Sequence, residues 1–165
     1  MEAGSIDLVY LGGSEAFSLS PTTIRNLVAY LNNGGTVLIE TIGGRGGFAA
    51  AVTRQLESVL GEQALPVDSR HPIITGAMKN TQGDSVGVDM RRVAYRRYST
   101  VTRGPVDEPR LLTLTVNGRV AVIISHEDLA LGVMGCQRWG IDGYDTGSAR
   151  GLMQNILLYA VHTGG

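Results

Sequence analysis

The stretch IDLVYLGGSEAFSLSPTTIRNLVAYLNNGGTVLIE, residues 6–40, holds two apolar runs on either side of an amphipathic segment. Residues 6–11 and 36–40 are almost continuously apolar, which is typical of strands buried on both faces. Between them, Ser20-Pro21 supplies a capping hydroxyl and a first-turn proline for a helix that Asn33-Gly34-Gly35 ends. Apolar residues recur along this helix at the spacing of one face: Ile24, Leu27, Val28 and Leu31. Strand, helix and strand within about 35 residues predict a right-handed βαβ unit with parallel strands.

The middle of the chain is less regular. A second helix is predicted over 47–60, where Phe48, Val52, Leu56 and Leu60 follow at i+4 steps. Residues 67–74 are expected to be extended, because the residue before a proline avoids the helical conformation. Residues 79–90 are interpreted as a loop, and 92–102, rich in β-forming residues, as a strand.

The C-terminal third begins with a strong hairpin signal. RLLTLTV and RVAVIIS, residues 110–116 and 119–125, flank Asn117-Gly118, the pair that suits a tight type I′ turn. A short extension is expected over 129–134, an ordered loop over 135–147 and a closing helix from 146 to 162. The whole pattern predicts one domain, residues 1–165, with an α/β three-layer sandwich whose mainly parallel sheet ends in an antiparallel hairpin.

Composition removes several classes of protein. The net charge is −1, so nucleic acid is not an expected partner. A single cysteine, Cys136, rules out an intrachain disulfide, and three scattered histidines make a metal site unexpected. No run of eighteen apolar residues is present, so this chain is not expected to insert into a membrane.

Four stretches together resemble the bacterial domain-of-unknown-function family four-one-five-nine: YLGGSEAFSLSPTTIRNLVAYLNNGGTVLIE, HPII, GRVAVIISHEDLALG and GYDTGSARGLMQNILLYAV. The resemblance covers about residues 8–161. It implies a class I glutamine-amidotransferase-like, flavodoxin-like fold, and it implies no activity. Family members usually carry an N-terminal βα segment that is not recognised here, and many lie behind a signal peptide or membrane helices. The resemblance therefore implies a piece of a longer protein, periplasmic or envelope-associated. In the family this second strand tends to end in two acids, whereas here it ends Glu40-Thr41.

The turn after that strand raises the question of a cofactor. Gly44, Gly46 and Ala49 spell G-x-G-x-x-A, and Asp68 follows about twenty residues later, which is the spacing of a dinucleotide-binding turn. The usual fingerprint, however, follows the first strand of its domain. Three readings stay open: a dinucleotide site, a site for another anion or small ligand, and a glycine-rich loop without a ligand.

Polar residues gather where the predicted parallel strands end. Ligands of open α/β sheets favour this carboxyl edge. The residues expected to line a ligand site there are Gly12, Gly13, Glu15, Glu40, Thr41, Gly44, Arg45, Gly46, Ser125, His126, Asp128, Tyr144 and Asp145. For Asp128 and Asp145 the alternative is a capping role at a turn or helix start.

No catalytic set can be assembled from recognisable positions. The strand-to-helix turn offers Thr41 and no cysteine, so the Cys-His-Glu arrangement of an amidotransferase is absent. The stretch RRVAYRRY, residues 91–98, interleaves arginine with tyrosine, and we interpret it as a strand whose long side chains cover neighbouring surface. The sequence therefore favours a non-catalytic module of a larger assembly that binds a small ligand or a protein. The alternative is a hydrolase or nucleotide-dependent enzyme with its site at the same edge. An exposed sheet edge also leaves a homodimer open.

Overall fold

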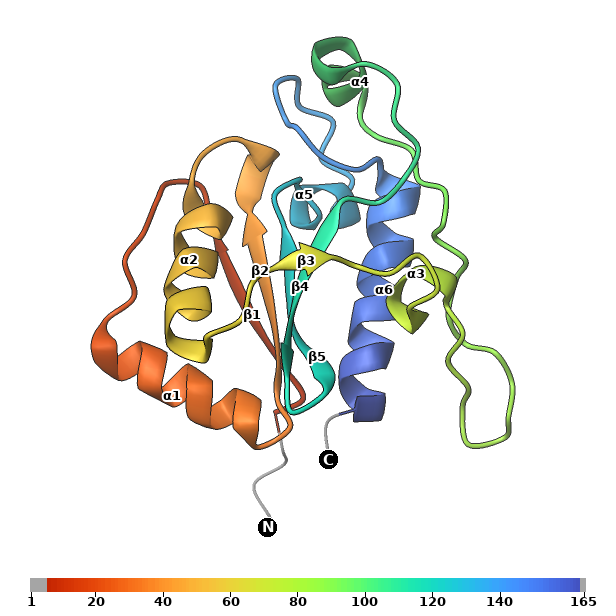
Figure 1. The fold of residues 1–165 in the computed structure, drawn as a ribbon. Helices are drawn as coiled ribbons and strands as arrows, with labels where there is room; N and C mark the ends of the chain where they lie inside the picture. Colours follow the sequence, from red (N-terminus) through yellow and green to blue (C-terminus); the bar gives the residue numbers. More distant parts are fainter. Residues whose placement is uncertain (1–5, 164–165) are drawn as a thin grey trace.

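The computed structural model describes residues 6–163 and contains one five-stranded open sheet (Figure 1). Its strands lie in the order β1-β2-β5-β4-β3. The pairs β1–β2 and β2–β5 are parallel, and β5–β4 and β4–β3 are antiparallel. The strand bounds are Leu8–Gly13 (β1), Thr36–Thr41 (β2), Leu65–Pro66 (β3), Leu111–Val116 (β4) and Arg119–Ser125 (β5).

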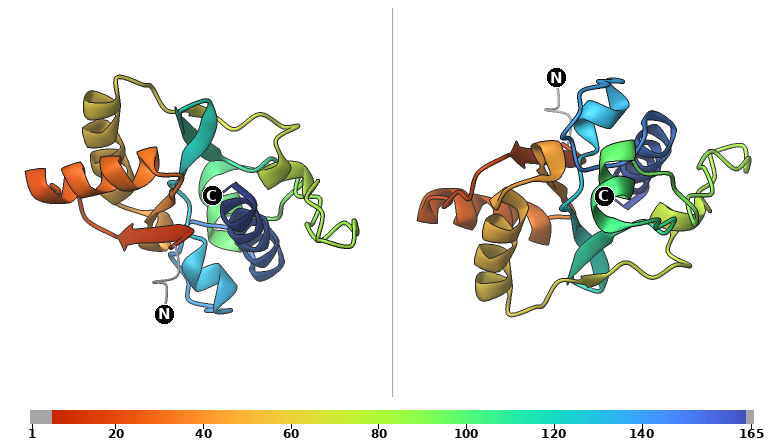
Figure 2. Two further views of the ribbon diagram at one scale, coloured as in Figure 1. Left: turned by 90° about the horizontal axis from the view of Figure 1, so that it is seen from below. Right: turned by 90° about the horizontal axis from the view of Figure 1, so that it is seen from above.

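Helices cover both faces of this sheet, which Figure 2 shows from below and above. One face carries α1 (Pro21–Asn32) and α2 (Phe48–Leu60), and the other carries α3 (Pro72–Thr75), α5 (Ala130–Val133) and the long α6 (Thr146–Thr163). A single turn, η1 (Ile42–Gly44), follows β2. The remaining helix, α4 (Arg97–Arg103), stands above the carboxyl ends of the parallel strands together with the loop before α6.

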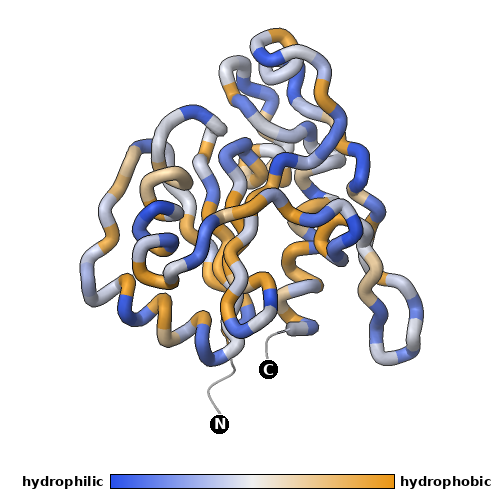
Figure 3. Tube along the Cα trace, viewed as in Figure 1, coloured by the Kyte–Doolittle hydropathy of each residue, from blue (hydrophilic) through white to orange (hydrophobic). Residues whose placement is uncertain are grey.

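The two hydrophobic layers follow from the alternation of side chains along the central strands. Val37 and Ile39 of β2 pack with α1 and α2, whereas Leu38 between them packs with α6 on the other face. On β5, Val122 and Ile124 belong to the first layer and Ile123 to the second. Apolar residues accordingly concentrate on the strands and on the helix sides that face them (Figure 3).

The local signals of the βαβ unit and of the hairpin are confirmed. Ser20 caps α1 by accepting a hydrogen bond from the backbone N–H of Thr23 at 3.1 Å, and Pro21 is its first residue. At the hairpin, Asn117 and Gly118 have φ of 51° and 77°, as a type I′ turn requires.

Four local expectations are wrong. The first strand is not buried on both faces: β1 is the sheet edge and is only partly covered. The segment 67–74 is not extended throughout, because a two-residue strand precedes it and α3 begins at Pro72. His71 itself is extended, with ψ of 142°, and it caps the helix that the proline starts. The stretch 129–134 is not extended, because residues 130–133 form α5.

The fourth wrong expectation is the strand over 92–102. Residues 97–103 form α4, and the residues before it bond to loops instead of a strand. The Val93 N–H donates to Asp107 O and the Arg96 N–H donates to Gly143 O. With only one isolated bridge, between Tyr95 and Tyr144, the segment has no neighbouring strand to extend the sheet.

No helix within residues 6–163 is long and apolar enough to cross a membrane.

Candidate functional site

The carboxyl ends of β1, β2 and β5 meet at one edge of the sheet, as the parallel pairing requires. Gly12 of β1 is level with Glu40 of β2, and Glu40 is level with Ser125 of β5. Gly13 is likewise level with Thr41. The predicted rim residues on these three strands therefore lie together.

Glu40 is completely buried at this edge, and its carboxylate holds the start of α5. Oε1 accepts the backbone N–H groups of Leu129 and Ala130, both at 2.8 Å. Oε2 accepts the hydroxyl of Tyr10 at 3.1 Å. Burial raises the pKa of Glu40 above its ordinary value, against the lowering effect of the backbone donors, and burial with the nearby Glu40 carboxylate raises the pKa of Tyr10.

Asp128, also completely buried, joins the turn after β2, the helix α5 and the loop before α6. Its Oδ2 accepts the N–H of Gly43 at 2.7 Å, and its Oδ1 accepts the N–H of Gly132 at 3.2 Å. The Asp128 backbone exchanges further bonds with Asp142 and Tyr144. Glu40 and Asp128 thus serve as acceptors for backbone donors that would otherwise lack a partner.

The glycine turn after β2 is packed against protein. A Cβ at Gly44 would lie 1.6 Å from Asp142 O, and one at Gly46 would lie 2.1 Å from Ser14 O. Thr41 Oγ1 accepts the N–H of Ala49 at 3.0 Å and so anchors the start of α2. The glycines therefore allow neighbouring loops to approach the turn closely.

Asp68, the acid of the predicted dinucleotide fingerprint, does not lie beside this turn. It follows β3, which is separated from β2 by β5 and β4. Its exposed carboxylate pairs with Arg70 and accepts the Arg70 backbone N–H.

Three further predicted residues have structural partners. Ser125 Oγ donates to Glu127 O at 2.6 Å. Tyr144 is completely buried, and its hydroxyl accepts the N–H of Arg110 at 2.9 Å; burial raises its pKa. Asp145 Oδ1 accepts the N–H of Ser148 at 2.7 Å, which caps α6.

The remaining predicted side chains are open to solvent. Glu15 and Arg45 are exposed and His126 is half-buried. The Arg45 guanidinium lies 5.6 Å from the centre of the Tyr98 ring, within the range of a cation–π contact. Arg45 thus reaches toward α4, which carries Tyr98.

An ion-pair cluster fastens α4 above the sheet edge. Arg103 pairs with Glu127 at 2.7 Å and also with Asp142, while Arg110 lies 3.6 Å from Glu127. Ser99 Oγ adds bonds to the backbone of Gly143. These contacts fix the segment 95–98 against the loop before α6.

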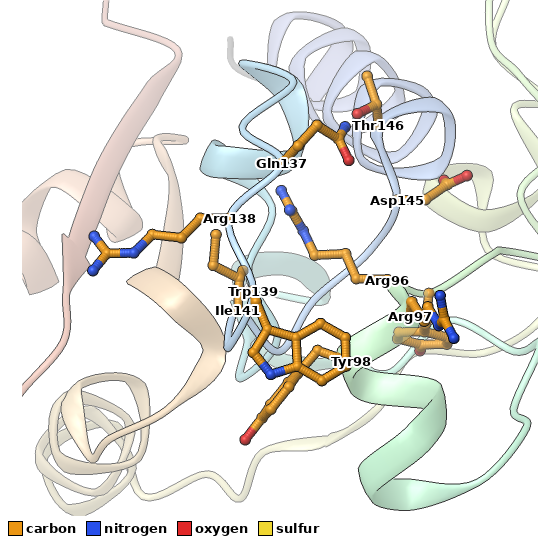
Figure 4. A pocket seen from close by; sticks show the side chains of 10 residues that line it. Arg96, Arg97, Tyr98, Gln137, Arg138, Trp139, Ile141, Asp145 and Thr146 are labelled. Atoms are coloured by element: carbon orange, nitrogen blue, oxygen red, sulfur yellow. The ribbon is translucent and has the colours of Figure 1, made fainter.

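A pocket of about 250 Å³ opens between these two segments (Figure 4). We call it the arginine pocket, because three of its lining residues are arginines, whereas only one is an acid. It is lined by Tyr95, Arg96, Arg97, Tyr98, Gln137, Arg138, Trp139, Ile141, Asp145 and Thr146. Asp145 is the one member of the predicted rim that lines it.

Arg96 lines the pocket, and most of its guanidinium is buried. Nη1 donates to the carbonyl of Cys136, while Nε and Nη2 are buried and have no hydrogen-bond partner among residues 6–163. In Figure 4 this guanidinium points toward the segment that carries Gln137. A buried charged donor without an acceptor is costly, so Arg96 is a group that an incoming anion would stabilise.

Arg97 and Arg138 bring two more positive charges to the surface around the pocket; both are exposed, and in Figure 4 the Arg138 guanidinium points away from that of Arg96. Within the described part of the chain neither forms an ion pair. Arg91 and Arg92, a few residues earlier, differ in this respect because they pair with Asp89 and Asp107. The arginine stretch 91–98 therefore divides into a paired half and an unpaired half, and the unpaired half lines the pocket.

Sequence reasoning missed this pocket, although it noted RRVAYRRY. The missing information was the position of Gln137, Arg138 and Trp139, which come from a loop some forty residues further along the chain. Among residues 6–163 no group of three or more histidine, cysteine or acidic side chains is placed to hold a metal ion.

In a comparison with protein families, the model described as "Domain of unknown function (DUF4159)" matches residues 4–161. Neither the curated proteins nor the solved structures gave a match.

Proposed function

The chain belongs to the DUF4159 family, and we propose that it is a non-catalytic binding module whose arginine pocket takes a small anionic ligand. It acts as one module of a larger bacterial assembly. The observation that carries the proposal is the Arg96 guanidinium, with two buried nitrogens that lack an acceptor beside two unpaired arginines.

The state of the rim acids supports a binding role over a catalytic one. Glu40 and Asp128, the acids on which a hydrolase at this edge would depend, are buried. Both oxygens of Asp128 and one oxygen of Glu40 accept backbone N–H groups, and the other oxygen of Glu40 accepts the Tyr10 hydroxyl. Their geometry suits the positioning of loops. The arginine pocket, in contrast, is lined by arginines that form no ion pair within residues 6–163.

The place of the pocket agrees with the fold that we propose, a flavodoxin-like arrangement related to the class I glutamine amidotransferases. In open α/β sheets, ligands bind outside the carboxyl ends of the strands. The segments that line the arginine pocket, the start of α4 and the loop before α6, stand on that side of the sheet (Figure 1). The N-terminus of α6, beside Thr146, adds a favourable partial positive charge, although the Asp145 carboxylate opposes it.

The test is thermal unfolding with inorganic phosphate at constant ionic strength. A ligand at about 100 times its dissociation constant adds roughly 2.7 kcal/mol to the free energy of unfolding, or about 5–10 °C in Tm for a domain of this size. The double variant Arg97→Gln/Arg138→Gln should lose this shift, because it removes two positive charges at the pocket. Both side chains are exposed, so the variant should still fold. The matched control Arg25→Gln/Arg54→Gln removes two exposed charges from α1 and α2 and should retain it. No shift in the parent, or equal shifts in both double variants, would overturn the proposal.

A further inference from the structure

An exposed aromatic platform adjoins the arginine pocket. Trp139 is 64% exposed although it is the largest apolar side chain in the chain. Its ring meets the ring of Tyr98 edge to face, with 5.3 Å between centroids and an angle of 89°. Figure 4 shows the two rings together at the pocket mouth. This contact holds the indole in one orientation and leaves ring surface open to solvent.

Tyr98 has a second ring contact. The Arg45 guanidinium lies over the Tyr98 ring at 5.6 Å, and this arginine comes from the loop after β2. Tyr98 is therefore held by one contact from the Trp139 loop and one from the β2 loop. The platform is built from three segments of the chain, which makes its position a property of the fold.

The volume of the pocket limits how much of a ligand can lie inside it. Small-molecule sites usually measure about 300–1,000 Å³, and the arginine pocket, at about 250 Å³, is slightly smaller. It has room for an anionic group and a sugar-sized body. A ring system attached to these would lie outside, against Trp139.

We propose that the ligand is a nucleoside monophosphate, with its phosphate beside Arg96 and its base stacked on Trp139. This inference rests on the proposed function and names the ligand class of the same pocket. Planar guanidinium groups suit a phosphate because they donate two parallel hydrogen bonds. Any base can stack on an aromatic side chain, so we expect the pocket to bind nucleoside monophosphates with little preference among the bases.

The chain offers a direct optical readout, because Trp139 is its one tryptophan. Titration with adenosine monophosphate should change the tryptophan fluorescence, whereas ribose 5-phosphate and inorganic phosphate should bind with little change. In calorimetry, adenosine monophosphate should bind about 5- to 150-fold more tightly than ribose 5-phosphate, the gain expected from one stacked base. Adenosine, which lacks the phosphate, should bind far more weakly than either.

Substitution of the platform separates this inference from the proposed function. In Trp139→Leu, calorimetry should give adenosine monophosphate the same affinity as ribose 5-phosphate, with phosphate binding unchanged. Circular dichroism checks that the variant is folded. If phosphate binds in an arginine-dependent way but the base adds nothing, or Trp139→Leu leaves the adenosine monophosphate affinity unchanged, the inference is wrong and the proposed function stands. If no phosphate compound binds, both fail.

A single-stranded oligonucleotide of about ten residues separates a free nucleotide from nucleic acid. With a net charge of −1 on the protein, the oligonucleotide should bind no more tightly than the monophosphate. Much tighter binding with a steep salt dependence would overturn the mononucleotide assignment in favour of nucleic acid.

Discussion

Glu40 is a carboxylate with no exposed surface, and what surrounds it determines how a substitution acts. Its oxygens accept two backbone N–H groups and one tyrosine hydroxyl. Glu40→Ala leaves the two N–H groups buried without an acceptor, at a cost of about 1–3 kcal/mol each. Urea denaturation should therefore show a loss of about 2–6 kcal/mol. Glu40→Gln keeps an acceptor oxygen at the same place and should lose much less; equal losses would contradict the hydrogen-bonding role.

The raised pKa of Glu40 adds a pH dependence to the same pair of variants. Burial raises the pKa of this carboxyl above 4.5, so the folded state keeps the proton to higher pH than the unfolded state. The corresponding stabilisation is complete below pH 4.5 and is lost as the pH rises through the raised value. Glu40→Gln does not titrate. The free energy of unfolding of the parent minus that of Glu40→Gln should therefore fall between pH 4 and neutral pH, and a constant difference would contradict the shift.

Gly43 and Gly44 provide a matched pair, since both have positive φ, 79° and 63°. A Cβ at Gly43 meets nothing within 4 Å, whereas one at Gly44 lies 1.6 Å from Asp142 O. Gly43→Ala should cost about 1–2 kcal/mol from the left-handed conformation alone. Gly44→Ala should cost clearly more, because the loop 140–145 has to move. Thermal unfolding of both variants measures the difference, and similar Tm values would show that the loops are not in close contact.

At the scale of elements, local signals were sufficient where a segment carries its own caps and turns. Ser20-Pro21 begins α1 and Asn117-Gly118 closes the β4–β5 hairpin, and both act within a few residues. The signals failed for 92–102, because a strand needs a neighbour and the neighbours of this segment are loops distant in sequence. The same limit applies to the site. The carboxyl edge could be predicted from parallel pairing. The arginine pocket could not, because it forms between residues 95–98 and 137–146, and no local sequence pattern indicates that these two segments meet.

Asn155 connects α6 to the loop 79–90 and to α3 through side-chain hydrogen bonds. It is completely buried; Oδ1 accepts the N–H of Val88, and Nδ2 donates to the carbonyls of Val88 and Ile73. Asn155→Ala leaves these groups without partners and should lower the free energy of unfolding by about 2–4 kcal/mol. It should also speed proteolysis within 79–90. Gln154→Ala, an exposed neighbour with one bond to Val86, is the control and should cost under about 1 kcal/mol. Equal effects would mean that Asn155 does not hold the segment.

At the scale of the whole molecule, the two hydrophobic layers share the same central strands. Ile123 and Ile124 are adjacent on β5, both completely buried, and they point into opposite layers. Each substitution to alanine should cost about 2–5 kcal/mol, from lost burial and the cavity left behind. Neither layer can separate without uncovering the strands that the other packs on, so unfolding should stay a single transition in both variants.

Two probes test this coupling in urea. Far-UV circular dichroism follows all the helices, and the fluorescence of Trp139 follows the loop before α6. The two curves should coincide in the parent, in Ile123→Ala and in Ile124→Ala. Leu157→Ala, at a position 48% exposed on α6, controls for the loss of an apolar side chain outside the core and should shift the midpoint much less. If Ile123→Ala moved the fluorescence curve alone, the α6 layer would unfold separately, and the arginine pocket would be lost before the rest of the sheet.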